Sequence, residues 1–542
     1  MTSPDVTVVV AVYNTMPYLT ECLNSLVGQS IGLDRLEIVA VDDGSTDDSG
    51  AELDRFAKKY PKTVKVIHQA NSGGPAAPSN RALEVATGRF VYFIGSDDYL
   101  GKEALARMVK CADKHDSDVV VGKMVGTNGR YVHQALYKKS NPDVSLYDSA
   151  LPFTLANTKL FRRDLVERHK LRFPEDLPVG SDQPFTIEAC VRARKISVLA
   201  DYTYYYAVKR GDSSNITYRA NHLSRLRCTA RILEHAAGLI EAGPQRDTVF
   251  QRHFTWELAK LVQGDFPSLD EQTRREVCAG IAELADDYLT ERLADSLPVT
   301  RRVRLTLAQR GMVDELAAAI EAEENGAPIP FHLEGDRAFA AYTGFRDPAV
   351  GIPDRIYEVL GESVPAMLAA GTELVSAEWE QSGDDLFLSV AVRTALRGDT
   401  ESAVVRLVQG AMPKSADKAG GRRLPAGQEL PPPVGEFSQE VSADGAGTVL
   451  RARIPVAART ATLGVRVHVD IAGWTYEIPV RAQDKPMPLA RRWRSGTPYR
   501  VAARVNAKGR MVVVTGLLFP PSDKWWSRVR PLLVRVKRKV SR

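Results

Sequence analysis

The sequence predicts an α/β domain with a mainly parallel sheet, followed by an α-helical module and carboxyl-terminal β-sandwich domains. In the first part of the chain, apolar strand-like runs alternate with helical segments at the spacing of βαβ units. Long charged segments with apolar residues at helical spacing come next. In the last part, apolar and polar residues alternate with a period of two between Gly- and Pro-bearing turns, which is typical of antiparallel sandwiches.

Length and composition indicate a multidomain globular protein. The 542 residues are too many for one ordinary core, and 44% of them are apolar and 26% charged. The net charge of +5 is small for this length and gives no indication of nucleic-acid binding. The five cysteines form no C-x-x-C pair, which argues against a disulfide framework or a zinc site and favours a reducing compartment.

The chain shows no pattern of membrane insertion or export. Its first residues have no basic segment followed by a long apolar run, so we expect no signal peptide. No window approaches the roughly 20 apolar residues that a membrane-spanning helix needs. We therefore expect a cytoplasmic protein.

The first domain begins with strands and helices in alternation. VTVVVAV is a continuous β-branched run, which is typical of a strand buried on both faces. The predicted elements, in order, are strand 6–12, a helix that includes Leu19 to Leu26, strand 36–43, helix 51–60, strand 64–69, helix 79–88 and strand 90–95. Ligands of such sheets bind beyond the carboxyl ends of the strands. Four aspartates fall at this edge: Asp42, Asp43, Asp97 and Asp98.

Changes of pattern divide the rest of the chain. Helical segments end at Pro328 and Pro330, and the PPPVGE stretch at 431–436 separates two regions of alternating residues. We therefore expect an α/β domain at 1–218, a helical linker module at 219–330, β-sandwiches at 331–430 and 431–520, and a basic aromatic tail at 521–542.

The tail differs from the other parts in its charge. From Lys524 onward it contains Trp525, Trp526 and eight Lys or Arg residues, and it has no acidic residue. Such a segment suits an anionic membrane surface. A solvated charged tail, or a final strand packed on its sandwich, explains the same residues about as well.

Two polar segments follow predicted strands and suit a nucleotide. A carboxylate of VDDGSTDD, which begins at Val41, can accept hydrogen bonds from a nucleobase or a ribose, although a polar turn that caps the next helix has the same composition. The segment NSGGPAAPSN at 71–80 is rich in Gly and Pro and opens a helix, so its exposed N–H groups suit a phosphate. Gly-rich turns are common, and this second signal is weak.

The segment Gly95-Ser96-Asp97-Asp98 is a candidate metal site. Mg²⁺ or Mn²⁺ is usually held by one or two carboxylates together with phosphate oxygens of the substrate, so one aspartate suffices. The alternative is that Asp97 or Asp98 caps the helix that follows.

Two later segments suit a general base and a diphosphate contact. Asp182 precedes Gln183-Pro184, and Pro184 fits the first turn of a helix whose dipole keeps the carboxylate ionised. A capping role explains Asp182 as well. Arg210 with Ser213 or Ser214 is able to clamp a diphosphate, although a solvated basic loop has the same residues.

The order of these parts resembles glycosyltransferase family 2, which has the nucleotide-sugar-binding GT-A fold. The resemblance covers roughly residues 5–215, and its motifs are VVVAVYN, VDDGSTDDS, NSGGPAAPSNRALEVATG and FIGSDDYLG. The segments GKMVGTNGRYV, KLFRRDLVERHKLRFPEDLPVGSDQPF and ISVLADYTYYY are most similar to wall teichoic acid poly(ribitol-phosphate) N-acetylglucosaminyltransferases and their actinobacterial relatives. This resemblance implies a helical linker and immunoglobulin-like carboxyl-terminal domains that serve homo-oligomerisation.

The resemblance also implies a role for each candidate residue. Asp182 would be the catalytic base, and Asp97 the ligand of Mn²⁺ or Mg²⁺. The uracil would contact Ala11, Tyr13 and Asp42 or Asp43, with Asn71 nearby, and Arg210 with Ser213 would contact the diphosphate. The full substrate-binding set is Ala11, Tyr13, Asp42, Asp43, Asn71, Arg81, Ser96, Asp98, Gln183, Arg210 and Ser213.

Three positions depart from the family pattern. Gly95 replaces the first acid of D-x-D, and Ser181 replaces the acid of E-D-Q. Ser79 stands where A-R-N-x-G has arginine, and Arg81 is a candidate substitute two residues later. Losing two acids and one base leaves the local charge roughly balanced, so the changes are either compensating or a sign of a different donor or of reduced activity.

The implied function is an inverting transfer of a sugar, an N-acetylhexosamine, from a UDP-sugar to a hydroxyl of a cell-wall polyol-phosphate polymer such as wall teichoic acid. The base takes a proton from an acceptor hydroxyl, and the metal and Arg210 stabilise the departing UDP. In the helical module, Arg246, Arg252 and His253 are candidates for holding a polyanionic acceptor, or they form an exposed helix face. The alternatives are an acceptor from exopolysaccharide, capsule or glycolipid, and a non-catalytic binding or scaffold protein derived from a transferase.

Overall fold

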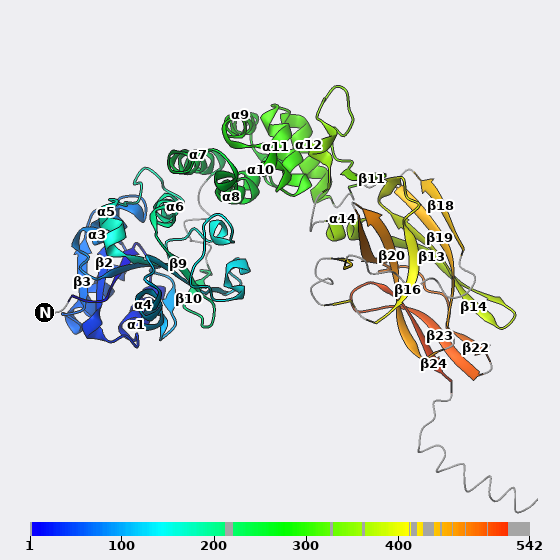
Figure 1. Ribbon diagram of the computed structural model, residues 1–542, viewed down its shortest axis with the longest axis horizontal. Helices are drawn as coiled ribbons and strands as arrows, with labels where there is room; N and C mark the ends of the chain where they lie inside the picture. Colours follow the sequence, from blue (N-terminus) through cyan, green and yellow to red (C-terminus); the bar gives the residue numbers. More distant parts are fainter. Residues whose placement is uncertain are drawn as a thin grey trace, which may run out of the picture. The chain divides into compact units, whose positions relative to one another are not determined.

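The computed structural model forms two compact units, residues 1–297 with 307–313 and residues 298–306 with 314–542 (Figure 1). No helix in the described part of the chain has the length and apolar character to cross a bilayer. The structure describes residues 3–211, 221–325, 329–335, 337–359, 364–410, 412–413, 420–425, 438–444, 447–457, 459–471, 473–495 and 497–518. Ser213, the PPPVGE stretch and the predicted tail at 521–542 therefore lie outside the described residues.

The first unit is built on a seven-stranded sheet with the order β3-β2-β1-β4-β8-β6-β9. Strands β1 to β4 are parallel to their neighbours, and β8 alone runs antiparallel, to β4 and β6. This arrangement confirms the predicted α/β domain with a mainly parallel sheet. The strands are β1 (Val6–Val12), β2 (Leu36–Asp42), β3 (Val64–His68), β4 (Phe90–Gly95), β6 (Val119–Gly122), β8 (Leu160–Arg162) and β9 (Ile196–Leu199).

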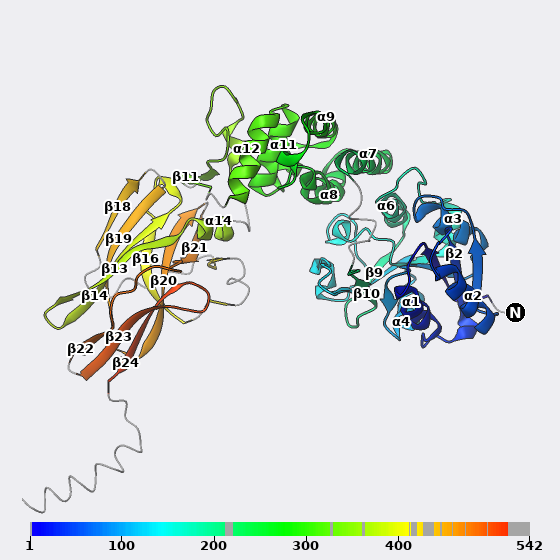
Figure 2. The same ribbon diagram turned by 180° about the vertical axis from the view of Figure 1, so that it is seen from behind.

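Helices cover both faces of this sheet, as Figures 1 and 2 show. One face carries α1 (Tyr18–Val27), α2 (Ser49–Lys59) and α4 (Ala104–His115), and the other carries α3 (Ala76–Val85), α5 (Arg163–Arg168) and α6 (Asp182–Arg192). Helix α3 begins three residues before the predicted start at 79, because Pro75 and Pro78 fit the cap and first turn of a helix. Short 3₁₀ helices are η1 (Leu33–Arg35), η2 (Ala135–Lys138) and η3 (Leu151–Phe153).

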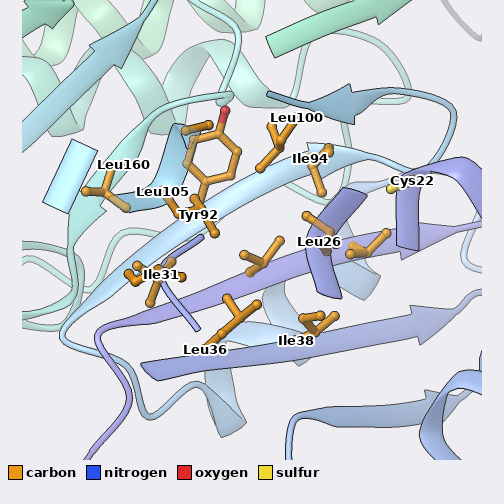
Figure 3. Close-up of a cluster of buried hydrophobic side chains, with 14 of the residues drawn as sticks. Cys22, Leu26, Ile31, Leu36, Ile38, Tyr92, Ile94, Leu100, Leu105 and Leu160 are labelled. Carbon is orange, nitrogen blue, oxygen red and sulfur yellow. The ribbon is translucent and has the colours of Figure 1, made fainter. Parts of the chain in front are cut away.

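The core between the sheet and α1, α2 and α4 explains why these segments fold as they do. Leu26 of α1, Ile38 of β2 and Leu105 of α4 are completely buried and belong to one apolar cluster (Figure 3). Burying each such side chain contributes roughly 1.5–3 kcal/mol, so the alternation of apolar strands and amphipathic helices fixes the strand order. It also places the ends of β1, β2 and β4 side by side at one edge.

A second, three-stranded sheet lies beside that edge and orders residues distant in sequence. Its order is β5-β10-β7, with β5 (Tyr99–Leu100), β10 (Tyr205–Val208) and β7 (Met124–Thr127). Because β5 follows β4 after Asp98 and β10 leads to Arg210, this sheet brings the acidic segment and that arginine together.

Helices follow the α/β domain. The first unit includes α7 (His222–Leu239), α8 (Pro244–Arg252), the π-helix η5 (His253–Leu258), η6 (Phe266–Ser268), α9 (Glu271–Tyr288) and α10 (Glu291–Asp295). Helix α7 packs against α6, so this segment contacts the helix that begins with Asp182. The division between the two units falls within α11 (Val299–Gln309) and at the start of α12 (Val313–Glu324).

The second unit is rich in β-strands, as predicted. Its sheets have the orders β12-β11-β15, β13-β14-β19-β18 and β17-β21-β20-β24-β23-β22, with β16 paired to β20. The strands are β11 (Phe331–Glu334), β12 (Arg337–Ala340), β13 (Glu373–Ser382), β14 (Asp385–Thr394), β15 (Leu396–Gly398), β16 (Val404–Gln409), β17 (Arg422–Arg423), β18 (Ser438–Asp444), β19 (Gly447–Pro455), β20 (Ala461–Ile471), β21 (Trp474–Pro479), β22 (Arg491–Ser495), β23 (Thr497–Val505) and β24 (Met511–Leu517). Two short helices, α13 (Asp354–Tyr357) and α14 (Val364–Ala370), accompany them.

Candidate active site

A cleft of about 920 Å³ opens where β1 and β4 end. Parallel strands present the ends of their chains at one edge, so this is the position expected for a ligand. Most of the residues proposed from the sequence line it: Ala11, Tyr13, Asp43, Asn71, Ser96, Asp97, Asp98, Asp182 and Arg210. Asp42, Arg81 and Gln183 are not part of its lining, and Ser213 lies outside the described residues.

The two aspartates after β2 have different environments. Asp43 lines the cleft and accepts hydrogen bonds from the Ser72 N–H at 3.1 Å and from Gln69 Nε2 at 2.6 Å. Asp42 points away from the cleft, where it accepts the Ser45 N–H at 3.0 Å and contacts His68 Nδ1 at 2.9 Å. Burial raises the pKa of Asp42, but these hydrogen bonds outweigh it and hold that pKa below its ordinary value. Asp43 is thus the residue placed to meet a ligand.

Tyr13 and Asn14 follow the end of β1 and line the cleft. The Tyr13 side chain is 46% exposed, which leaves its ring accessible to a planar group. Asn14 adopts a left-handed conformation with φ of 47°, and its side-chain oxygen accepts the Thr46 N–H at 2.8 Å. Asn14 therefore ties the turn after β1 to the turn after β2, a contact that the sequence analysis did not identify.

Asp98 is a structural residue within the acidic segment. Its side chain is almost fully buried and accepts hydrogen bonds from the Tyr205 hydroxyl at 2.5 Å and from the Val208 N–H at 2.7 Å. Burial, helped by the charge of Asp97, raises the pKa of Asp98 to about 6, although Arg130 opposes this. The oxygens of Asp98 thus bond to residues of β10 and hold the structure of the site together.

Asp97 has the more open environment of the two. Its Oδ2 lies 2.8 Å from Nε of Arg210, and both residues line the cleft. The sequence placed these residues 113 positions apart, and the small sheet of β5 and β10 brings them into contact. A carboxylate and a guanidinium side by side at this edge form a site for a diphosphate and for a hard cation.

The donor set around Asp97 fits a cation that takes most of its ligands from elsewhere. In the described part of the chain, no three His, Cys, Asp or Glu side chains gather as a metal site. Mg²⁺ commonly binds through one or two carboxylates and completes its shell with phosphate oxygens and water. One carboxylate at the edge of an open cleft is therefore compatible with Mg²⁺ or Mn²⁺ that arrives with a diphosphate.

Asp182 is the first residue of α6, with Ser181 as the preceding cap. It lines the cleft and is partly buried. Burial raises the pKa of Asp182, and the charges of Arg252 and Lys159 counteract part of that rise. A carboxylate with a raised pKa at the edge of a cleft, influenced by two nearby positive charges, has the properties of a general base.

Gln183 faces the helical segment and not the cleft. Its Oε1 accepts a hydrogen bond from Nη1 of Arg252 at 2.8 Å and lies 2.9 Å from Nε2 of His253. Burial, with the charge of Arg252, lowers the pKa of His253 to about 3, so the ring is neutral and donates Nε2–H to Gln183. These residues are therefore part of the packing behind the base.

The three basic residues proposed from RDTVFQRHF have separate environments. Arg246 packs over the rings of Phe250 and Tyr288, at 5.8 and 5.9 Å from their centroids. Arg252 pairs with Glu257 at 3.1 Å and is mostly buried, and His253 is completely buried. The alternative of an exposed helix face is thus wrong for Arg252 and His253, because both pack against Gln183.

Two cations near the site were missed by the sequence analysis. Arg130 lines the cleft and donates to Asp98 at 3.3 Å and to the Val208 carbonyl at 3.0 Å. Lys159 is buried and donates to the carbonyl oxygens of Thr154 and Ala156 in the loop that borders the cleft. Burial lowers the pKa of Lys159 to about 8. The sequence offered one signal for Arg130, because the Asn-Gly pair before it is typical of a tight turn. Both Asn128 and Gly129 have positive φ in the structure.

Arg81 lies on the exposed side of α3 and pairs with Glu84 on the same helix. The neighbouring Asn80 faces inward and donates to the Phe173 carbonyl at 2.9 Å, so the helix presents Arg81 away from the cleft. Ser79 is buried, 5% exposed, and does not reach the cleft lining.

Comparison with known proteins relates both parts of the first unit to one family. The family described as Glycosyl transferase family 2 matches residues 7–173, and the Glycosyl transferase TarS linker domain matches residues 224–320. The crystal structure of Staphylococcus aureus TarS 1–349 in complex with UDP-GlcNAc is 30% identical, with a TM-score of 0.57 over 66% of this chain and 99% of that chain. The chain belongs to glycosyltransferase family 2.

Two curated relatives of this family 2 glycosyltransferase differ in the sugar group that their names give. The poly(ribitol-phosphate) beta-glucosyltransferase of Bacillus spizizenii is 44% identical over 214 residues, which are 39% of this chain and 34% of that protein. The poly(ribitol-phosphate) beta-N-acetylglucosaminyltransferase TarS of Staphylococcus aureus is 43% identical over 203 residues, 38% of this chain and 35% of that protein. The match spans about a third of the length of these curated relatives.

The linker match includes the residues that contact Gln183. Arg252 and His253 lie within 224–320, whereas Asp43 and Asp97 lie within 7–173. Asp182 falls between the two matched segments. In this family 2 glycosyltransferase the helical segment therefore packs directly behind the residue next to the candidate base.

Proposed function

We propose that this enzyme transfers a sugar from a UDP-sugar to a hydroxyl group of a polyol-phosphate cell-wall polymer such as wall teichoic acid. The sugar is an N-acetylhexosamine, and the reaction inverts the anomeric configuration and depends on Mn²⁺ or Mg²⁺. One observation carries the proposal: Asp43, Asp97, Arg210 and Asp182 line a single cleft at the strand ends.

The nucleotide occupies the end of the cleft formed by β1 and β2. The uracil stacks on the exposed ring of Tyr13 and receives hydrogen bonds at Asp43, with Asn71 beside it. The Asp43 carboxylate is held in place by Ser72 and Gln69, so it does not need to reorganise when the base binds. Ala11, near the end of β1, lines the cleft with a small side chain that leaves room for the ring.

The diphosphate lies against Asp97 and Arg210. Asp97 would hold the divalent cation with its carboxylate, and Arg210, now paired with Asp97, would contact the phosphate oxygens. The cation, when bound, neutralises negative charge that develops on the departing UDP. Ser96 is 6% exposed and hydrogen-bonded to Thr15 at 2.9 Å, so it fixes the backbone before Asp97.

Asp182 acts on the acceptor. Its carboxylate removes the proton from the attacking hydroxyl as the new bond forms to the anomeric carbon, on the face opposite the leaving UDP. The bond from that carbon to the diphosphate oxygen breaks in the same displacement, so the configuration inverts. The raised pKa of Asp182 makes its carboxylate a stronger base than an exposed one.

The acceptor is inferred from the relatives. Both curated relatives are named as poly(ribitol-phosphate) glycosyltransferases, one for a glucosyl and one for an N-acetylglucosaminyl group. Arg130 adds a second cation to the cleft lining, which suits a polymer of phosphodiesters. The alternative is an acceptor from exopolysaccharide, capsule or glycolipid. An assay that compares these acceptors with poly(ribitol phosphate) distinguishes the two.

The second unit and the tail have proposed roles in assembly and in membrane binding. The antiparallel sheets of the second unit are immunoglobulin-like sandwiches that join copies of the chain, and the tail binds the inner membrane surface. Five free, buried cysteines support a reducing, cytoplasmic setting. Sedimentation of the full chain tests the first statement, and flotation with anionic and neutral vesicles tests the second.

A UDP-release assay tests the proposed reaction. The full chain is incubated with poly(ribitol phosphate) and a panel of UDP-sugars, with Mn²⁺, with Mg²⁺ and with EDTA. We expect UDP release that needs the cation and falls at least about a hundredfold in Asp182→Asn, because the amide is no base. Asp176→Asn, six residues earlier and exposed, is the matched control. The absence of UDP release from every donor would refute the proposal.

A further inference from the structure

The three departures from the family pattern surround one cavity. A space of about 210 Å³ adjoins the cleft and shares Ala11, Gly95 and Asp182 with it. Ser79 and Ser181 line this space together with Gly95, although they come from α3, the cap of α6 and the end of β4. Positions that appear unrelated in the sequence therefore face the same small volume, which we call the recess.

The walls of the recess are apolar and hold two hydroxyl groups without partners. Val9, Phe93 and Phe173 supply the apolar walls. Ser79 is 5% exposed and Ser181 is 3% exposed, and in the described part of the chain neither hydroxyl makes a hydrogen bond. Neither serine oxygen is among the fully buried atoms that lack a partner, so both are accessible and able to bond a ligand or water in the recess. The volume far exceeds the roughly 10–15 Å³ that one water molecule needs.

The lining of the recess is almost uncharged, so it does not suit an ionic group. Among the described residues that line it, Asp182 is the one that ionises. The family pattern that the chain resembles has an arginine at 79 and acids at 95 and 181, where this chain has two serines and a glycine. A Cβ atom at Gly95 would already lie 3.0 Å from Oδ1 of Asp97 and 3.1 Å from Oδ2 of Asp98. Ser79, Gly95 and Ser181 therefore line the recess without adding charge to it.

We propose that the recess binds an uncharged acylamino substituent on C2 of the donor sugar. This inference rests on the proposed function, because it places the sugar by the reaction. Asp182 must reach the hydroxyl that attacks the anomeric carbon C1, so C1 lies near Asp182, and C2 is bonded to C1. A group on C2 is therefore the part of the sugar that is able to enter a space bordered by Asp182 and Gly95.

The chemistry of an acylamino group matches the recess. Its N–H donates to one serine hydroxyl, its carbonyl accepts from the other, and its methyl group packs against Phe93 and Phe173. A plain C2 hydroxyl would leave the apolar walls and one serine unpaired. A site built to hydrogen-bond a substituent discriminates strongly against donors that lack it. Ser79 and Ser181 are accordingly specificity-determining residues.

The test compares two donors that differ only at C2. For the full chain, kcat/KM is measured with UDP-N-acetylglucosamine and with UDP-glucose, and the ratio of the two values is the readout. We expect the wild-type ratio to favour the acetylated donor by at least about tenfold. Ser79→Met fills the recess without adding charge and reduces the ratio at least tenfold. Ala77→Met adds the same side chain to α3 outside both cavities and keeps the wild-type ratio.

A binding measurement separates this inference from the proposed reaction. Calorimetry gives the dissociation constants of UDP, UDP-N-acetylglucosamine and UDP-glucose for wild type and Ser79→Met. UDP does not reach the recess, so equal UDP affinity in both proteins shows that Ser79→Met is folded. A preference for the acetylated donor that Ser79→Met removes supports the recess even if no transfer occurs. Equal affinity and equal kcat/KM for the two donors, or a ratio unchanged in a folded Ser79→Met, would overturn it.

Discussion

Nη1 of Arg252 lies 2.8 Å from Oε1 of Gln183, the residue that follows the candidate base Asp182. Arg252 is the last residue of α8, in the helical segment beyond the α/β domain. His253 donates to the same oxygen, and Trp256 on the adjacent π-helix packs against Phe153. The helical segment therefore does more than connect domains: it holds the start of α6 and adds a positive charge near the base.

Removing the Arg252 charge is expected to change the pH dependence of the reaction. The pKa of Asp182 is raised by burial and lowered by Arg252, so in Arg252→Met it rises further. A base with a higher pKa is protonated over a wider range, so the acidic limb of the kcat/KM profile moves to higher pH. Activity is lost most at low pH and recovers as the pH rises.

Arg246→Met is the matched control for this prediction. Arg246 lies on the same helix, but it packs on Phe250 and Tyr288 and does not contact Gln183. Its pH–rate profile should keep the wild-type position, and Arg252→Lys should restore part of the shift. A profile of Arg252→Met that is lowered equally at every pH would show that Arg252 has a structural role alone.

Local sequence patterns predicted the edge of the sheet where the site lies. Continuous apolar runs mark buried parallel strands, and polar residues that follow such runs must lie at the carboxyl edge. This logic placed Asp42, Asp43, Asp97 and Asp98 at one edge, and three of these four aspartates line the cleft: Asp43, Asp97 and Asp98. It did not separate Asp42, the last residue of β2, from Asp43, because the choice depends on which one the His68 side chain engages.

Other features depend on contacts that no local pattern encodes. Arg252 meets Gln183 across 69 positions, and this contact exists because α7 packs on α6. The recess requires the packing of α3 against the sheet and of α6 over β4, which the letters Ser79, Gly95 and Ser181 do not reveal separately. The balance of charge among the three departures could be read from the sequence, but the cavity that they share could not.

Asp97 and Asp98 are expected to respond differently to replacement by alanine. Asp97→Ala should lower kcat/KM at least about a hundredfold with little change in stability, because Asp97 is the candidate cation ligand at the open edge. Asp98→Ala leaves the Tyr205 hydroxyl and the Val208 N–H without an acceptor. Each such buried group costs about 1–3 kcal/mol of the free energy of unfolding.

Urea unfolding and metal titration measure both effects. Activity of Asp97→Ala should no longer respond to Mn²⁺, whereas its unfolding midpoint should stay close to wild type. If the two variants showed the same loss of stability, the assignment of Asp98 to the framework and Asp97 to the cleft would fail.

Introducing an aspartate at Gly95 is expected to be harmful by itself. The new Cβ would lie 3.0 Å from Oδ1 of Asp97 and 3.1 Å from Oδ2 of Asp98. The new carboxylate would also add negative charge beside these two carboxylates. Overpacking of this kind costs about 1–3 kcal/mol. Gly238→Asp, at an exposed helical position with open space around it, is the control and should cost less than about 1 kcal/mol. Thermal unfolding of the two variants measures both costs. No loss of stability in Gly95→Asp would show that a side chain at position 95 is tolerated.

A buried ion cluster is expected to make the second unit sensitive to acid. Glu477 of β21 is 1% exposed and bonds Nη1 of Arg466 at 2.7 Å and Nε of Arg422 at 2.8 Å. Burial alone would raise the pKa of Glu477, but hydrogen bonds from His468 and Arg422 and the charge of Arg466 lower it to about 2.

The sign of the effect follows from that lowered pKa. A carboxyl group with a lower pKa in the folded state stabilises the fold above its unfolded pKa, and this contribution is lost as the pH falls from about 4.5 toward 2. The shift corresponds to about 3 kcal/mol. Glu477→Gln should remove this pH dependence and destabilise the unit at neutral pH by about 3–5 kcal/mol, since two arginines lose their buried partner. Hydrogen exchange of β20 and β21 at pH 7 and pH 4 measures it, and equal protection of Glu477→Gln and wild type at pH 7 would contradict the assigned role.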